Sequence, residues 1–166
     1  MKWISIAAAS VLTLGAVSGL YGCASDNGFN PLAIAQSSGD EAKAETYAED
    51  GIAIKGADPV AYFTQEQYVP GSSAYEYEWK GATWQFSSAE HRELFAANPE
   101  QYAPQYGGYC AWALSEGQIA PIDPTKWTVV DGKLYLNFNE EIQGRWEKDI
   151  PGHITRADQN WPGILS

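Results

Sequence analysis

The chain has 166 residues, with 21 acidic and 10 basic side chains and a formal net charge of -11. This length supports one domain with a hydrophobic core rather than two. The acidic balance and the lack of any Lys/Arg cluster exclude nucleic acid as a partner, because nucleic acids and anionic lipid surfaces are bound by basic patches. Hydrophobic residues at 45% and charged residues at 19% are typical of a globular protein.

The first residues predict export. Met1 and Lys2 provide a short positive start, and residues 3–20 carry no charge. This pattern is typical of a secretory signal peptide, which we assign to residues 1–22, although the apolar run also approaches the length of a membrane-spanning helix.

The end of this segment indicates a lipid anchor. Leu20-Tyr21-Gly22-Cys23 resembles a bacterial lipobox, in which the cysteine becomes the lipidated N-terminus. We therefore expect a protein held by lipid at Cys23 in the periplasm or on the outer surface, with no other membrane contact. A second cleavage pattern, Ala33-Ile34-Ala35, is an alternative that would remove Cys23.

Residues 23–50 predict a flexible tether, because they combine turn residues and acidic charge without an apolar period. The remaining residues, 51–166, predict a globular α+β domain in which antiparallel hairpins pack with short helices. Its first elements are a strand at 52–54, a helical turn at 60–63 begun by Asp58-Pro59, and a hairpin at 75–86 that turns at Lys80-Gly81.

The chain continues with a helix that a Ser87-to-Glu90 capping box opens and that ends near Asn98. On this helix His91, Leu94 and Phe95 share one face, which predicts that they point toward the core. Further elements are expected as a helix at 109–116, a hairpin at 127–137 that turns at Asp131-Gly132, a helix at 140–148 and a last short helix capped by Thr155. Trp146 and Trp161 are expected to close the core.

Cys110 is the first candidate for chemistry. With Cys23 lipidated or removed, it is the single free thiol of an exported protein and has no disulfide partner. A place in the first turn of a helix favours the thiolate, the form that binds metals, whereas a free cysteine is also often a buried packing residue.

His91 is the second candidate, as a metal ligand or general base on the inward face of its helix. His153 is a weaker candidate, and Asp58 and Glu90 are the carboxylates that could complete a site, although helix capping also explains both. Closed zinc motifs, nucleophile elbows, phosphate loops and dinucleotide fingerprints are all missing from the sequence, so we expect no enzyme and no organic cofactor.

Several segments resemble the YHS-domain family, in its exported branch: Asp58-Pro59-Val60, Trp84-Gln85-Phe86-Ser87-Ser88, Phe95 to Tyr102, Tyr106-Gly107-Gly108-Tyr109-Cys110-Ala111 and the hairpin Asp131 to Leu136. The resemblance covers about residues 51–161. Metal-handling members of the family carry a cysteine directly after Asp-Pro-Val and a cysteine pair after the hairpin. This chain has Ala61, Ser87 and His91 at those three positions.

The resemblance implies metal handling. We expect a soft or borderline metal ion, copper before zinc, bound by His91 and by Cys110 as a thiolate. The alternative is a non-metal module that docks a protein partner through its aromatic surface, with Cys110 buried and inert. A third hypothesis, a thiol-dependent enzyme, requires Cys110 to be exposed with a low pKa.

Overall fold

A computed structural model describes residues 43–166. The predicted signal peptide 1–22, the lipidation site Cys23 and most of the predicted tether lie outside these residues. No helix within 43–166 has the length and hydrophobicity needed to cross a membrane.

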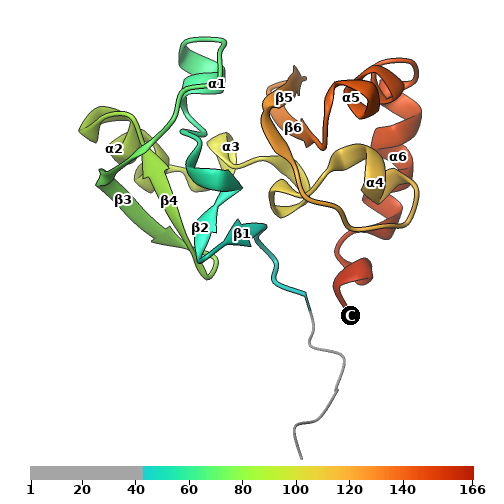
Figure 1. The fold of residues 1–166 in the computed structure, drawn as a ribbon, viewed down its shortest axis with the longest axis horizontal. Helices are drawn as coiled ribbons and strands as arrows, with labels where there is room; N and C mark the ends of the chain where they lie inside the picture. Colours follow the sequence, from blue (N-terminus) through green and yellow to red (C-terminus); the bar gives the residue numbers. More distant parts are fainter. Residues whose placement is uncertain (1–42) are drawn as a thin grey trace, which may run out of the picture. The chain divides into compact units, whose positions relative to one another are not determined.

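The described chain forms an α+β domain, as the sequence predicts (Figure 1). In its N-terminal half, residues 43–102, a four-stranded sheet has the order β1-β2-β4-β3. The strands are β1 (Ala48–Glu49), β2 (Ile52–Ala53), β3 (Ser72–Trp79) and β4 (Ala82–Phe86). The pairs β1/β2 and β3/β4 are antiparallel, while β2 joins β4 in parallel at Ile52 and Thr83.

Short helices cover this sheet and connect its strands. They are the 3-10 turn η1 (Ile54–Gly56), α1 (Ala61–Thr64), α2 (Ala89–Ala97) and α3 (Pro99–Tyr102). The Ser88 hydroxyl caps α2 by accepting from the His91 backbone N–H at 3.1 Å. The cap is therefore one residue later than the capping-box pattern predicts, which leaves the Ser87 side chain free for another contact.

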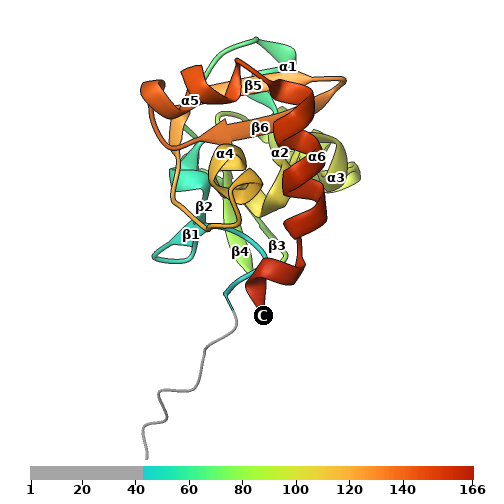
Figure 2. The ribbon, with the colours of Figure 1, turned by 90° about the vertical axis from the view of Figure 1, so that its right-hand side faces the viewer.

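The C-terminal half, residues 103–166, is a β-hairpin surrounded by helices. Its elements are η2 (Gln105–Gly108), α4 (Ala111–Ser115), β5 (Asp123–Val130), β6 (Lys133–Asn137), α5 (Glu140–Trp146), α6 (Ile150–Asn160) and η3 (Gly163–Leu165). Figure 2 shows α6 running along the side of this half, where it packs on α4. Both predicted hairpins and their two glycine turns are confirmed.

Aromatic side chains build the core. Phe95 of α2 packs on Trp84 and Phe86 of β4, with ring centroids 5.1 and 5.2 Å apart. In the C-terminal half, Trp146 is fully buried against Tyr135 at 5.3 Å. Trp146 therefore closes the core as predicted, whereas Trp161 is only partly buried.

The structure corrects three sequence-based expectations. Leu94 is exposed at 37%, because the inward stripe of α2 is narrow and contains only His91 and Phe95. The last helix begins at Ile150, since Asp149 caps it, and Thr155 lies inside it. The domain begins before residue 51, because Tyr47 is buried and β1 is part of the sheet.

Candidate functional site

Asp58 lies three residues before the first residue of α1 and is fully buried. Its Oδ1 atom accepts hydrogen bonds from the backbone N–H groups of Val60 at 3.0 Å and Ala61 at 3.3 Å. These contacts satisfy amide groups that the short helix leaves without internal partners. One oxygen of the carboxylate is thus fixed by its own segment, and the other is free to bind residues distant in sequence.

The second oxygen of Asp58 joins the sheet to α2. Oδ2 accepts from the Ser87 backbone N–H at 2.8 Å and from the Ser87 hydroxyl at 2.6 Å. It also lies 2.6 Å from Nδ1 of His91, whose side chain is only 11% exposed. Because a carboxylate only accepts, Nδ1 carries the proton of this hydrogen bond.

The other ring nitrogen of His91 points toward α1. Nε2 lies 3.3 Å from the hydroxyl oxygen of Thr64, an exposed residue at the end of that helix. The Thr64 hydroxyl donates to the Val60 carbonyl at 3.1 Å, so its oxygen is available as an acceptor. This arrangement accommodates a proton on Nε2, and in the neutral ring it leaves an Nε2 lone pair beside an exposed position.

Cys110 lies at a different place in the fold. It is the N-cap residue of α4 and is fully buried, with Sγ 3.8 Å from Oδ1 of buried Asn137. Burial raises the pKa of the Cys110 thiol, against the opposing effect of backbone N–H groups from α4 and Phe138. The folded protein therefore favours the neutral thiol at this position, in contrast to the thiolate that a helix N-terminus predicted.

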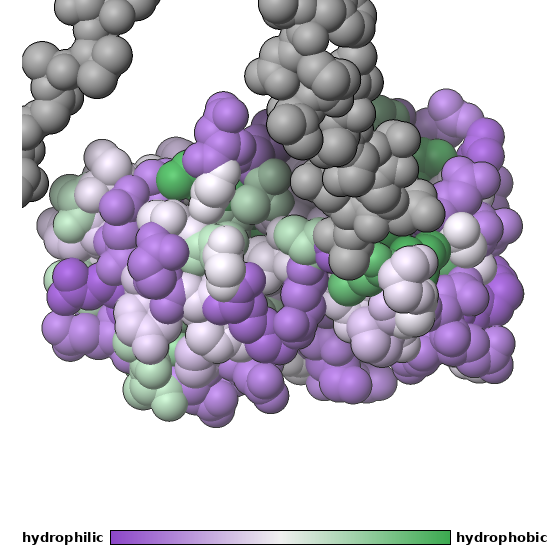
Figure 3. Space-filling model, turned by 90° about the horizontal axis from the view of Figure 1, so that it is seen from below, coloured by the Kyte–Doolittle hydropathy of each residue, from purple (hydrophilic) through white to green (hydrophobic). Residues whose placement is uncertain are grey.

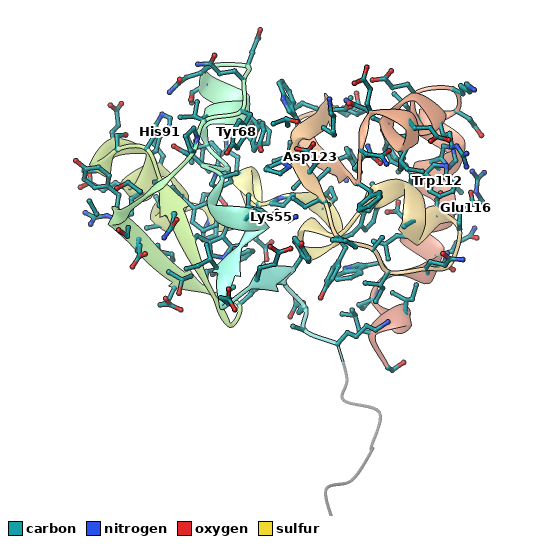
Figure 4. All side chains as sticks on the ribbon, viewed as in Figure 1. Lys55, Tyr68, His91, Trp112, Glu116 and Asp123 are labelled. Carbon is teal, nitrogen blue, oxygen red and sulfur yellow. The ribbon has the colours of Figure 1, made fainter. Side chains whose placement is uncertain are left out.

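The structure does not bring His91 and Cys110 together. They share no hydrogen-bond partner, and Figure 4 shows His91 in the N-terminal half while Trp112, two residues after Cys110, lies in the C-terminal half. Within residues 43–166 no group of three or more His, Cys, Asp or Glu side chains is placed to hold a metal ion. The candidate carboxylate Glu90 is exposed on α2, so Asp58 alone is paired with His91.

His153 belongs to a separate polar cluster in the C-terminal half. Its Nδ1 lies 2.7 Å from the Ser115 hydroxyl and 2.7 Å from the Arg156 guanidinium, and its ring stacks on Trp146. Because a guanidinium only donates, Nδ1 acts as the acceptor and the ring proton is on Nε2. These contacts occupy Nδ1 and hold the ring against Trp146, which indicates a structural role for His153.

Two partners of His91, Ser87 and Thr64, are not among the residues singled out for chemistry from the sequence. Thr64 lies 27 positions from His91 and on another helix, so no helical spacing connects them. Because Ser88 rather than Ser87 caps α2, the Ser87 hydroxyl is available to donate to Asp58. The sequence alone does not show this, since it requires knowing at which residue the helix begins.

Comparison with known proteins identifies one family. The model of the YHS domain matches residues 60–106, so a YHS domain is present in this part of the chain. No curated protein and no solved structure matches. The matched segment contains Thr64, Ser87 and His91, and it ends before Cys110.

The three positions at which metal-handling YHS proteins carry cysteine converge in this fold. Ala61, Ser87 and His91 each contact the Asp58 side chain, through a backbone N–H, a hydroxyl and a ring nitrogen respectively. The side chains at these positions are thus a methyl group, a hydroxyl and an imidazole. Of these, the imidazole and the hydroxyl suit borderline metal ions better than soft ones.

Proposed function

We propose that this protein is a non-enzymatic metal-handling module that binds a soft or borderline metal ion, copper before zinc, at His91. The YHS domain is commonly linked to metal handling, copper included. The observation that carries the proposal is the Asp58–His91 hydrogen bond, which holds Nδ1 and directs Nε2 toward exposed Thr64.

This geometry supports His91 as a ligand because a metal-binding imidazole generally donates its second ring N–H to a carboxylate. That hydrogen bond selects the tautomer, orients the ring and makes the free nitrogen more basic. Copper precedes zinc in the proposal because nitrogen and oxygen sites bind Cu²⁺ more tightly than Zn²⁺.

The surroundings of Nε2 favour a metal ion that is bound reversibly and passed on, rather than one that stays bound permanently. Thr64 is the one side chain hydrogen-bonded to Nε2 among the residues that the structure describes. A metal at this nitrogen would complete its coordination with water or with groups of a donor or acceptor protein. Such an open site exchanges its ion readily, which suits transfer.

Cys110 would be a second metal ligand, at a position separate from His91. Its raised pKa and complete burial mean that a metal would reach it only after local opening of the fold. The same properties argue against a thiol-dependent enzyme, because such enzymes use an accessible thiolate.

We further propose that the domain is exported and anchored by lipid at Cys23, so that it meets metal ions outside the cytoplasm. The support is the charge-free segment 3–20 and the lipobox-like sequence that ends at Cys23. Mass spectrometry of the protein from its native membrane fraction should show an acylated N-terminal peptide beginning at Cys23. An unmodified N-terminus after Ala35 would contradict the anchor and leave the metal proposal standing.

The direct test of metal binding is a titration of Cu(II), Cu(I) and Zn(II) against the protein and two variants. His91→Ala should lower Cu(II) affinity at least tenfold, because it removes the coordinating nitrogen. His153→Ala is the matched control, since it removes the other histidine, and it should leave the affinity unchanged. Equal affinities for all three proteins, or no binding by any of them, would overturn the proposal.

The interaction-module hypothesis remains the second candidate, because Cys110 is buried as that hypothesis requires. The surface argues against this hypothesis. Within residues 43–166, the exposed large hydrophobic side chains are Leu94 on α2 and Phe138 in the connection between β6 and α5. Figure 3 likewise shows hydrophilic residues predominating on the face that it presents, where grey atoms do not cover it. A protein partner that docks on apolar surface would find little of it.

A further inference from the structure

A pocket of about 230 Å³ lies outside the Asp58–His91 site and shares no residue with it. It is formed where the β3–β4 hairpin meets residues 45–46, the segment 103–107 and the C-terminal Trp161. The volume is below the roughly 300–1,000 Å³ typical of sites for drug-sized ligands, so this pocket suits a smaller molecule.

Four aromatic side chains line the pocket: Trp79 and Trp161 are partly exposed, whereas Trp84 and Tyr106 are buried behind them. Trp79 and Trp84 of the hairpin form one pair, with centroids 5.7 Å apart and planes at 60°. Tyr106 and Trp161 form the other, with centroids 6.2 Å apart and planes at 65°. Faces of tryptophan and tyrosine rings attract cations through their quadrupoles, and tryptophan does so most strongly.

The side chain of Lys80 already makes a cation–π contact with one of these rings, that of Trp79. The Lys80 ammonium lies 4.7 Å from the centroid of the Trp79 ring. Its Nζ is also 2.9 Å from Oε1 of Glu45 and 3.9 Å from Oε1 of Glu100. An ammonium group is thus held between an indole face and two carboxylates at the edge of the pocket.

The charged side chains that line the pocket determine whether it favours a cationic or an anionic ligand. Lys80 is the single Lys or Arg among the described residues that line the pocket, and its charge is opposed by two carboxylates. The local sum is therefore one negative charge, which disfavours anions and favours a second cation. The three side chains are 37%, 56% and 78% exposed, so their ion pairs are weak and Lys80 can move into solvent.

We propose that this pocket binds a small organic cation, a primary or quaternary alkylammonium, whose charged group takes the place of the Lys80 ammonium over Trp79. Glu45 and Glu100 compensate the charge of the ligand, and the surrounding rings contact its alkyl groups. In the free protein Lys80 acts as an internal competitor that lowers the affinity. This activity is independent of the metal site, because no residue belongs to both.

The test is a titration with choline and butylammonium, followed by tryptophan fluorescence and by NMR shifts of the indole N–H groups. The expected result is binding that weakens at high salt, with chemical shift changes at Trp79 and Trp161. Acetate should not bind, and 3,3-dimethylbutanol, an uncharged isostere of choline, should bind at least tenfold more weakly. Binding of the isostere as tight as that of choline would overturn the proposal, since the pocket would then be merely apolar.

Two variants sharpen the test. Lys80→Met should bind choline at least tenfold more tightly, because it removes the competitor and leaves both carboxylates uncompensated. Glu100→Gln should weaken binding severalfold. Because the Glu100 side chain is 78% exposed, this change should leave the fold intact. Lys80→Met with an affinity equal to or below that of the unmodified protein would contradict the role of Lys80.

A matched control exists in the C-terminal half. The Arg145 guanidinium lies 5.5 Å from the centroid of the Trp112 ring and 2.7 Å from the Glu141 carboxylate. Arg145→Met removes a cation from a tryptophan face in the same way but lies away from the pocket, so it should leave choline affinity unchanged. An equal gain in both variants would indicate nonspecific attraction to a more acidic protein and would refute the site.

Discussion

Asp58 Oδ2 and His91 Nδ1 lie 2.6 Å apart, although the two residues are 33 positions apart in the sequence. Asp58 is fully buried and accepts hydrogen bonds from α1, from Ser87 and from His91. This carboxylate therefore links the start of α1, the end of β4 and the start of α2. The proposed metal ligand depends on it for both its tautomer and its orientation.

Replacement of Asp58 should destabilise the protein strongly. In Asp58→Asn the amide nitrogen is a donor and faces the Ser87 and His91 donors, so buried groups lose their acceptor. Each buried donor left without its acceptor typically costs about 1–3 kcal/mol of unfolding free energy. Urea denaturation measures the loss, and Glu90→Gln on the exposed side of α2 is the control, expected within about 0.5 kcal/mol of the unmodified protein. Equal stability of the two variants would contradict the linking role of Asp58.

Two glycines with positive φ should respond very differently to alanine. At Gly107, with φ of +62°, an added Cβ would lie 1.8 Å from the Glu45 carbonyl oxygen, so the backbone has to move. At Gly132, with φ of +73°, nothing lies within 4 Å of the same atom. Gly132→Ala should therefore cost only the backbone strain of about 1–2 kcal/mol, and Gly107→Ala clearly more. Thermal unfolding distinguishes them, and a smaller loss at Gly107 would show that residues 45–47 are not held against this turn.

Buried tyrosines should make the protein sensitive to alkali. Burial raises the pKa of Tyr62 and, together with the Asp158 hydrogen bond, that of Tyr106. Burial also raises the pKa of Tyr109 and Tyr135. Above the ordinary tyrosine pKa of about 10, the unfolded chain loses these protons while the folded chain keeps them, so the free energy of unfolding falls as pH rises.

Phenolate absorbance followed with pH measures this effect. Tyr62, Tyr106, Tyr109 and Tyr135 should titrate only together with loss of the folded circular dichroism signal. The same titration in urea should show one step. A single step in the folded protein, without unfolding, would contradict the burial of these phenols.

The Cys110 thiol should react with alkylating reagents only through opening of the fold. The thiol is fully buried and its pKa is raised, so the reactive thiolate is both rare and inaccessible. Labelling by iodoacetamide should be at least a hundredfold slower in the native protein than in urea. Comparable rates would place Cys110 at the surface and would reopen the hypothesis of a thiol-dependent enzyme.

Short-range signals account for most of what the sequence predicted correctly. The turns at Lys80-Gly81 and Asp131-Gly132 are set by adjacent residues, and the Asp58 cap of α1 acts over three. The second role of Asp58 was not predictable in this way, because it depends on how α2 packs against α1. The separation of His91 from Cys110 has the same origin, since each belongs to a different half of the domain and sequence distance does not report it.

Paramagnetic broadening by Cu(II) is the most direct measurement of whether a metal ion binds at Nε2 of His91. The ring signals of the two histidines are recorded by NMR while substoichiometric Cu(II) is added to the intact protein. We expect the His91 signals to disappear first and those of His153 to persist, because its Nδ1 is occupied by Ser115 and Arg156 and its ring stacks on Trp146. Broadening of His153 before His91, or of neither, would contradict a metal-binding role for this site.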